Sequence, residues 1–435
     1  MKHIKLGRWL PFLSIATFLL AGQGSIRAQD PVEKPKLPNG EISSRSFVDQ
    51  SMLVSKFTTE QYAHQSSMRI VNGMGYVVYQ CNENTPEENQ AGQVARMAVF
   101  NILNPTATAT WVDVAQVGET SDGVTIGGTF VSGPMLHILN EKTLRIFFVG
   151  RLGSDTISGY RAFYKDYDIA TGKLAGFKAI RCTIGKDPSK VMDLAVPAIQ
   201  AQLDFLFGAG FGEQFARGIS TPCDFTEFDG QLYSSIQIKN SVDGVTKLMT
   251  NVLMRSSDQG QTWELMGAPD PRLLTTEVKI LAEPAITQDR NYVYLHLRTN
   301  VVEGGYVLCK TKKSDLYTFD APVKKWTYGI GRPTIANFGK PIGMVAMFTA
   351  ASVPMGGNQM TRNKCDVVQI DPSYKKYTKA FSIVDYNAVN TPFMFLYRDE
   401  MFVSYSTGRR RLHAKFGTSE IVFSKLRREF FVPTE

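Results

Sequence analysis

The sequence has few of the features that define several large protein classes. No long run of Lys or Arg is present, and a formal net charge of +8 over 435 residues is small for a nucleic-acid-binding protein. The five cysteines are scattered, odd in number and without the spacing of metal ligands. HExxH, P-loop, G-x-S-x-G and EF-hand patterns are absent. We therefore expect neither a nucleic-acid partner nor a metal or organic cofactor, and we interpret the cysteines as ordinary buried residues.

A long apolar run occurs only near the N-terminus. Residues 9–21 are apolar and follow a basic segment, and small or polar residues lead from there to Ala28. A run of this length is too short for a hydrocarbon core of about 30 Å, which favours a secretory signal peptide over residues 1–28 rather than a membrane anchor. Cleavage would reduce the net charge from +8 to +4 by removing four basic residues, Lys2, Lys5, Arg8 and Arg27. We expect the mature chain to be secreted or periplasmic, with no integral membrane segment.

The remaining sequence is typical of an all-β protein. A content of 43% hydrophobic and 20% charged residues, with 36 glycines, fits a folded globular chain. Residues 29–45 form a Pro-rich polar linker. From Ser46 onward, short runs rich in Val, Ile, Tyr and Phe alternate with period two between Gly, Asn and Asp clusters. Three histidines alternate with apolar neighbours and are interpreted as buried core or rim residues rather than ligands: His64, His137 and His296.

These runs recur in one order. Each unit has an opening strand, a tight turn with Asp, Asn or Gly, an aliphatic-aromatic strand, a loop and an outer hairpin. We expect six units, beginning near Gln65, Gly133, Ser220, Glu283, Arg332 and Thr391. Residues 46–60 would add a strand to the last unit and close a ring. Radial repetition of this kind predicts a six-bladed β-propeller over residues 46–435.

One segment departs from the β pattern. Residues 186–206 show helical spacing, with Asp187 as a candidate N-cap and Pro188 at the first helical position. They predict a short helical insertion between blades two and three. The helix packs on the rim in one interpretation and covers the active site as a lid in the other.

Residues 256–263, Ser-Ser-Asp-Gln-Gly-Gln-Thr-Trp, carry the pattern S-x-D-x-G-x-T-W. In such a turn Asp258 can accept hydrogen bonds from turn amides, Gly260 can take a positive φ, and Trp263 can pack beneath the turn. The pattern resembles the Asp-box of sialidases and related proteins. This resemblance implies a six-bladed β-propeller built from such hairpins. Because the box is structural, it says nothing about catalysis.

The sialidase resemblance also implies a set of site residues. Sialidases hold the carboxylate of their substrate with three arginines, since planar guanidinium groups bind carboxylates in a bidentate way. They use a Tyr nucleophile activated by a Glu, with an Asp acid/base, an exception to the usual pair of carboxylates. Arg69-Ile70-Val71 resembles the Arg-Ile-Pro motif, with Val71 in place of proline. Glu283 and Arg298, fifteen residues apart, resemble the Glu and the second arginine, and Arg362 resembles the third.

Two positions depart from the sialidase pattern. Gln93 stands near the acid/base position, and an amide cannot donate and recover a proton. Glu87 and Glu88 lie in the same loop and are the candidate acids. Tyr386 is the nearest candidate for the nucleophile. Counting back from the final strand indicates other positions instead, Asn390 or Thr391.

Three functional hypotheses follow. The first is an exported, sialidase-like exo-acting glycoside hydrolase for glycans that contain an acidic sugar. The second is a catalytically inactive propeller that binds glycan or protein, motivated by Gln93 and by the missing clean Tyr. The third is a related hydrolase with different substrate chemistry that uses other carboxylates, such as Asp224 or Glu227 in blade three.

Overall fold

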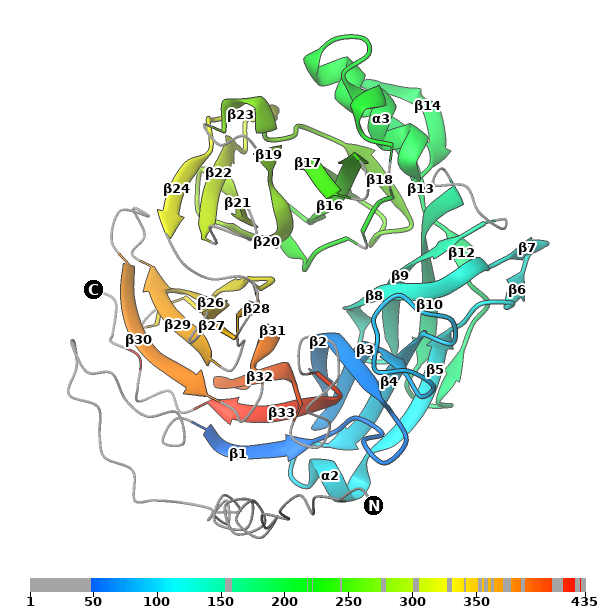
Figure 1. Ribbon diagram of the computed structural model, residues 1–435, viewed down its shortest axis with the longest axis vertical. Coiled ribbons are helices and arrows are strands. Elements are labelled where there is room, and N and C mark those ends of the chain that lie inside the picture. The colour runs from blue at the N-terminus through cyan, green and yellow to red at the C-terminus, as the bar shows by residue number, and fades with distance from the viewer. Residues whose placement is uncertain are drawn as a thin grey trace, which may run out of the picture.

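The structure is a computed structural model in which the chain forms a ring of β-sheets around a central axis (Figure 1). It describes residues 48–152, 159–216, 218–220, 222–242, 245–274, 279–299, 305–326, 331–339, 342–350, 354–355, 359–360, 364–370, 377–384, 388–408, 418–426 and 431. The predicted signal peptide, residues 1–28, and the predicted linker, residues 29–45, lie outside the described residues. Within these ranges no helix is long and apolar enough to cross a bilayer.

Blades one to three occupy the first half of the ring. Blade one pairs four strands in sequence order: β2 (Tyr62–Val71), β3 (Met74–Asn82), β4 (Val94–Asn101) and β5 (Thr110–Ala115). Blade two contains β8 (Gly127–Asn140), β9 (Thr143–Arg151), β10 (Tyr160–Asp168), β11 (Lys173–Leu174) and β12 (Lys178–Ala179). Blade three contains β15 (Thr226–Phe228), β16 (Gln231–Val242), β17 (Val245–Ser256), β18 (Thr262–Leu265), β13 (Arg181–Ile184), β14 (Asp187–Asp193) and β19 (Lys279–Ile280).

Blades four to six complete the ring. Blade four contains β20 (Ala282–Gln288), β21 (Tyr292–Arg298), β22 (Tyr306–Lys312), β23 (Asp315–Phe319) and β24 (Val323–Trp326). Blade five contains β25 (Thr334–Asn337), β26 (Met344–Ala350), β29 (Lys364–Ile370) and β30 (Tyr377–Val384). Blade six contains β31 (Asn390–Tyr397), β32 (Glu400–Thr407), β33 (Glu420–Leu426) and the N-terminal β1 (Val48–Leu53).

Pairing of β1 with β33 joins the two ends of the described chain, with Leu53 opposite Val422. The prediction that residues 46–60 add a strand to the last unit and close the ring is therefore confirmed for the residues of β1. Two-stranded hairpins and short helices lie outside the blades: β6 (Thr120–Ser121), β7 (Val124–Thr125), β27 (Pro354–Met355), β28 (Gln359–Met360), α2 (Pro105–Thr108), η3 (Gly212–Gln214) and η4 (Pro271–Leu273). The sequence prediction of an all-β, six-bladed propeller is confirmed.

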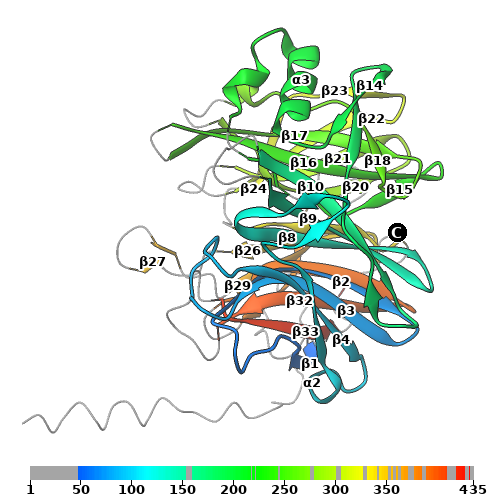
Figure 2. The same ribbon diagram turned by 90° about the vertical axis from the view of Figure 1, so that its right-hand side faces the viewer.

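The insertion between blades two and three contains the helix α3 (Val196–Phe207), which lies on the outer rim (Figures 1 and 2). Its predicted location is confirmed, but its predicted start at Asp187 is wrong. Residues 187–193 form β14 and pair with β13 at the edge of blade three. Asp187 accepts hydrogen bonds from Ser189 in a local turn, so it does not cap a helix. The helix instead begins at Val196, with Ala195 as its N-cap residue and Pro197 in its first turn.

The 256–263 turn packs into the largest core cluster of the propeller. Both carboxylate oxygens of Asp258 accept from the Thr262 backbone N–H, at 2.9 and 3.1 Å, and the Thr262 hydroxyl donates to Oδ2. Gly260 has φ +87°. Trp263 is 1% exposed and donates from Nε1 to the Gly260 carbonyl at 3.0 Å. The turn thus closes on itself and buries its indole against Phe147.

Candidate functional site

A cavity of about 390 Å³ lies at the end of the propeller where the inner strands begin. All six predicted blade starts line it: Gln65, Gly133, Ser220, Glu283, Arg332 and Thr391. One position in each blade is therefore directed to the same space. We call this space the axial cavity.

A repeated backbone irregularity places four of these residues. In β2, β8, β20 and β31 the inner strand advances three residues while its neighbour advances two, which is a one-residue bulge. The bulge residue has a left-handed conformation in each case, with φ of +54° at Gln65, +58° at Gly133, +48° at Glu283 and +46° at Thr391. Three of the four precede proline, which suits a bulge because proline donates no ladder hydrogen bond.

An ion pair stands in the wall of the axial cavity. Glu283 Oε2 lies 2.8 Å from Arg298 Nη1, and the two side chains are 28% and 12% exposed. The contact follows from the β20–β21 hairpin, in which Ala282 is paired with Arg298. The Glu283 backbone N–H donates to Gln237 Oε1 at 2.6 Å, so blade three also fixes the bulge. The structure thus brings two of the sequence-predicted residues together.

Further charged groups face the same space. Arg332 and Lys239 line the cavity as additional cations, and Glu88 lines it as a second carboxylate. Glu88 Oε1 accepts from Gln80 Nε2 at 3.0 Å, and Gln80 Oε1 in turn accepts from the Gly133 backbone N–H at 3.1 Å. The lining therefore combines three cations with two carboxylates, an arrangement suited to an anionic ligand that carries hydroxyl groups.

The other two candidate residues of the blade-one loop, Gln93 and Glu87, do not line the cavity. Gln93 is 1% exposed, donates to the Val131 carbonyl at 2.8 Å and accepts from the Asn89 backbone N–H at 2.7 Å. It therefore holds the loop against blade two. Glu87 is exposed to solvent. Two sequence-predicted residues, Tyr386 and Arg362, lie outside the described residues.

Arg69 lies away from the axial cavity. Its Nη2 is 2.8 Å from Asp224 Oδ1, its Nη1 donates to the Met68 carbonyl, and its guanidinium is 5.2 and 5.3 Å from the rings of Phe393 and Phe395. Arg69 follows the bulge at Gln65 by four residues, a translation of about 13 Å along a strand. This distance carries Arg69 toward the opposite mouth of the propeller.

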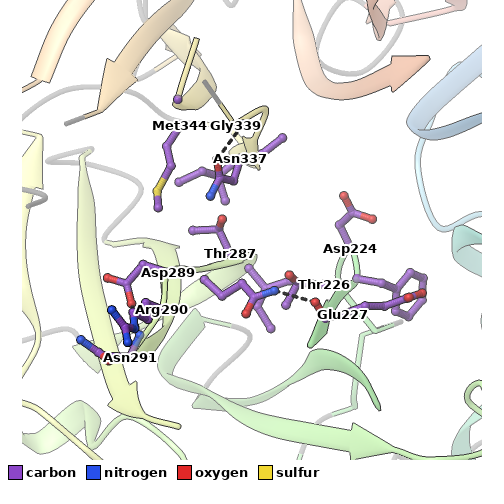
Figure 3. A pocket seen from close by; sticks show the side chains of 16 residues that line it. Asp224, Thr226, Glu227, Thr287, Asp289, Arg290, Asn291, Asn337, Gly339 and Met344 are labelled. Carbon is purple, nitrogen blue, oxygen red and sulfur yellow. Dashed lines mark hydrogen bonds between the residues drawn. The ribbon is translucent and has the colours of Figure 1, made fainter. Parts of the chain in front are cut away.

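The opposite mouth holds a second cavity, of about 960 Å³. Figure 3 shows Asp289, Arg290 and Asn291 on one side of an open space, with Asp224 and Glu227 across from them. Cys223 lines the axial cavity while its neighbour Asp224 lines the opposite one, so the chain passes between the two at this point. The alternative carboxylates Asp224 and Glu227 thus share a site, but not with Glu283.

Cys223 is the cysteine that lines the axial cavity. Burial raises the pKa of its thiol to about 12, and its Sγ lies 3.2 Å from the Asp224 carbonyl. A thiol with this pKa stays protonated at neutral pH and is a poor nucleophile. All five cysteines are buried and free, as expected from the sequence. No group of three or more His, Cys, Asp or Glu side chains in the described part of the chain is arranged to hold a metal ion.

The repeat pattern marks Gln65, Arg332 and Thr391 as blade starts but gives Gln65 and Arg332 no role in the site. Lys239 and Tyr160, which also line the cavity, were not predicted. A usable signal was present in the dipeptides Gly133-Pro134, Glu283-Pro284, Arg332-Pro333 and Thr391-Pro392. Three of them lie at or just before the start of a strand, and Gly133-Pro134 lies at the bulge within β8. A backbone donor is dispensable at such positions, and each residue that precedes the proline lines the axial cavity.

Comparison with known proteins shows the fold. No protein-family model matches the sequence, and no curated protein matches it. Among solved structures, Trypanosoma rangeli sialidase matches with a TM-score of 0.57 at 13% identity, over 85% of this chain and 55% of that one. The Hadza microbial sialidase Hz136 matches with a TM-score of 0.58 at 12% identity, over 86% and 67% of the two chains. A protein of unknown function from Dyadobacter fermentans matches with a TM-score of 0.56 at 10% identity, over 87% and 98%.

The chain therefore has a sialidase-like six-bladed β-propeller fold, and it spans about 55% of the length of the trypanosomal sialidase. The trypanosomal enzyme has also been solved in complex with sialic acid, with a TM-score of 0.57 at 12% identity to this chain. At this identity the likeness concerns the fold alone.

Proposed function

We propose that this chain is an exported exo-acting glycoside hydrolase that takes the terminal acidic sugar of a glycan in the axial cavity. One observation carries the proposal: strand starts from all six blades converge on a cavity that holds three cations and two carboxylates. Export rests on the signal-peptide pattern of residues 1–28.

The cations provide the recognition step. Arg298 is held by Glu283 and is 12% exposed, so its guanidinium is oriented before a ligand arrives. Arg332, whose Nη2 lies 3.4 Å from Met135 Sδ, contributes a second planar fork from blade five. Two guanidinium groups and the Lys239 ammonium favour a sugar carboxylate over a neutral pyranose. Arg362 stays a prediction as a further member of this set.

The carboxylates provide the chemistry. Glu88, oriented by Gln80, would act as the acid that protonates the leaving-group oxygen. Glu283 would activate the nucleophile, for which Tyr386 stays the prediction from sequence. A neutral nucleophile relayed through Glu283 avoids repulsion between an attacking carboxylate and the anionic sugar.

A direct assay tests the proposal. The purified chain should hydrolyse a fluorogenic α-sialoside, and Glu283→Gln and Arg298→Ala should each lower kcat/KM by about 100-fold or more. Glu141→Gln, an exposed change in the turn between β8 and β9, is the matched control and should retain wild-type activity. Activity in the Glu283→Gln and Arg298→Ala variants equal to that of the wild type would remove these residues from the mechanism.

A second candidate function is supported by blade six. Thr391, not a tyrosine, occupies the bulge that faces the cavity, and Gln93 is committed to holding the blade-one loop. Both features fit a propeller that binds an acidic glycan without turnover. Calorimetric titration with sialic acid and with a uronic acid separates the two functions, because saturable binding without released product supports the binding protein.

A further inference from the structure

A smaller cavity adjoins the cavity at the opposite mouth, and we call the two cavities its lobes. The larger lobe, about 960 Å³, is lined by blades three, four and five, and the smaller, about 350 Å³, by blades one, two, three, five and six. The lobes share five residues, which form the ridge between them: Asp224, Phe225, Glu227, Ala336 and Asn337. Together the two lobes have room for more than one ring of a chain-like ligand.

The ridge carries three planar polar side chains, two of which, Asp224 and Asn337, are held in place. Asp224 is 22% exposed and fixed by its ion pair with Arg69. Glu227 is 61% exposed, with Oε1 3.9 Å from His137 Nε2. Asn337 Oδ1 accepts from the Gly339 backbone N–H at 3.0 Å, as drawn in Figure 3, which orients its amide. Carboxylate and amide planes of this kind offer paired hydrogen-bonding positions for vicinal hydroxyl groups.

An apolar surface adjoins these groups. Phe225 is half-buried and stacks against Trp263, with ring centroids 6.4 Å apart and planes at 24°. Ile286 and Ile335 continue the apolar lining. A pyranose presents an apolar C–H face beside its hydroxyl rim, so this combination of a ring surface and polar planes matches both parts of a sugar.

The charge of the opposite mouth differs from that of the axial cavity. Asp224 is already paired with Arg69, and Asp289 accepts from the Asn291 and Tyr292 backbone N–H groups and from the Tyr294 hydroxyl. The exposed Arg290 and the paired Arg69 are the two guanidinium groups of this lining, against three carboxylates. Glu227 therefore leaves the mouth with an exposed negative charge that repels an anionic ligand.

We propose that the opposite mouth binds a neutral oligosaccharide across its two lobes, with Glu227, Asp224 and Asn337 bonded to its hydroxyl groups. This proposal is independent of the function assigned to the axial cavity. The chain would then have two glycan sites: the axial cavity would bind an acidic terminal sugar, and the opposite mouth would bind a neutral saccharide chain.

The test is calorimetric titration of the full chain with neutral tetrasaccharides: cellotetraose, mannotetraose, xylotetraose and chitotetraose. We expect saturable binding of at least one of them, weakened at least tenfold by Glu227→Ala and by Asn337→Ala. Both residues lie at the surface, and unchanged thermal unfolding of each variant shows that the fold is kept. Glu283→Gln, in the axial cavity, is the matched control and should bind the tetrasaccharide as the wild type does.

Three outcomes would overturn the inference. The first is no binding of any tetrasaccharide at millimolar concentration. The second is binding that Glu283→Gln abolishes and Glu227→Ala leaves intact, which would place the saccharide in the axial cavity. The third is binding at the opposite mouth of sialyllactose or an acidic peptide in preference to the neutral probes.

Discussion

Replacement of Gly260 by alanine tests how tightly the turn at 256–263 is packed. Gly260 has φ +87°, a conformation that costs an L-residue about 1–2 kcal/mol. A Cβ at this position would lie 2.7 Å from Phe147 Cζ and 3.1 Å from Trp263 Cζ2. Both rings are buried, at 0% and 1% exposure, so they cannot move into solvent, and overpacking adds about 1–3 kcal/mol. We expect Gly260→Ala to lower the free energy of unfolding by about 2–5 kcal/mol.

Gly230→Ala is the matched control in the same blade. Gly230 has φ +69°, and no atom lies within 4 Å of the position that a Cβ would occupy, so only the conformational cost of about 1–2 kcal/mol applies. Urea unfolding followed by tryptophan fluorescence measures both variants against the wild type. An equal loss of stability in the two would refute the packing argument. Adding Phe147→Leu to Gly260→Ala should recover part of the loss, because it shortens the ring that the Cβ meets.

Two further predictions concern buried charge. Burial lowers the pKa of His137 from 6.5 to about 4, so folding favours the neutral imidazole. The contribution of neutral His137 to the free energy of unfolding is complete above pH 6.5 and is lost as the pH falls toward 4. About 2 kcal/mol of the free energy of unfolding should therefore be lost between pH 7 and pH 5. In urea unfolding, His137→Gln should flatten this dependence of the free energy of unfolding on pH. Equal slopes of the free energy of unfolding against pH in the wild type and in His137→Gln would contradict this prediction. Arg96 pairs with Glu60, which is 0% exposed, at 2.8 Å, so Arg96→Met should cost about 3–5 kcal/mol. Glu60→Gln should restore part of that stability in the Arg96→Met background, and calorimetric unfolding of the single and the double variant would detect a failure to do so.

The fold could be predicted because its signals are local and repeated. Proline and glycine at strand starts, Asn-Gly or Asp-Gly turns and period-two alternation each act within a few residues, and six repetitions reinforce one another. The predicted start of α3 was wrong for the opposite reason. The segment at 187–193 is mostly exposed, and its conformation is decided by pairing with β13, a contact that its own helical spacing does not contain.

The candidate site was predictable only where its geometry is set by one hairpin. Glu283 and Arg298 meet because β20 and β21 form one hairpin, which pairs the start of β20 with the end of β21. The separation of fifteen residues in the sequence is therefore enough to predict that the two side chains lie close together. Arg332 and Lys239 reach the same cavity from other blades. Their convergence depends on how the blades are arranged around the axis, which no local pattern specifies.

The bulges of the inner strands show why counting residues along such a strand is sensitive to register. A bulge at Gln65 inserts one residue between the part of β2 that faces the axial cavity and the part that continues toward the opposite mouth. Because side chains alternate along a strand, one inserted residue reverses which face each later residue occupies. The same device in blade six directs Thr391 to the cavity, while Asn390 is fully buried with Oδ1 3.3 Å from Thr349 Oγ1. A count that ignores the bulge therefore assigns neighbouring residues to the wrong side of the strand, and the bulge residues themselves are the positions from which the chemistry of this propeller should be sought.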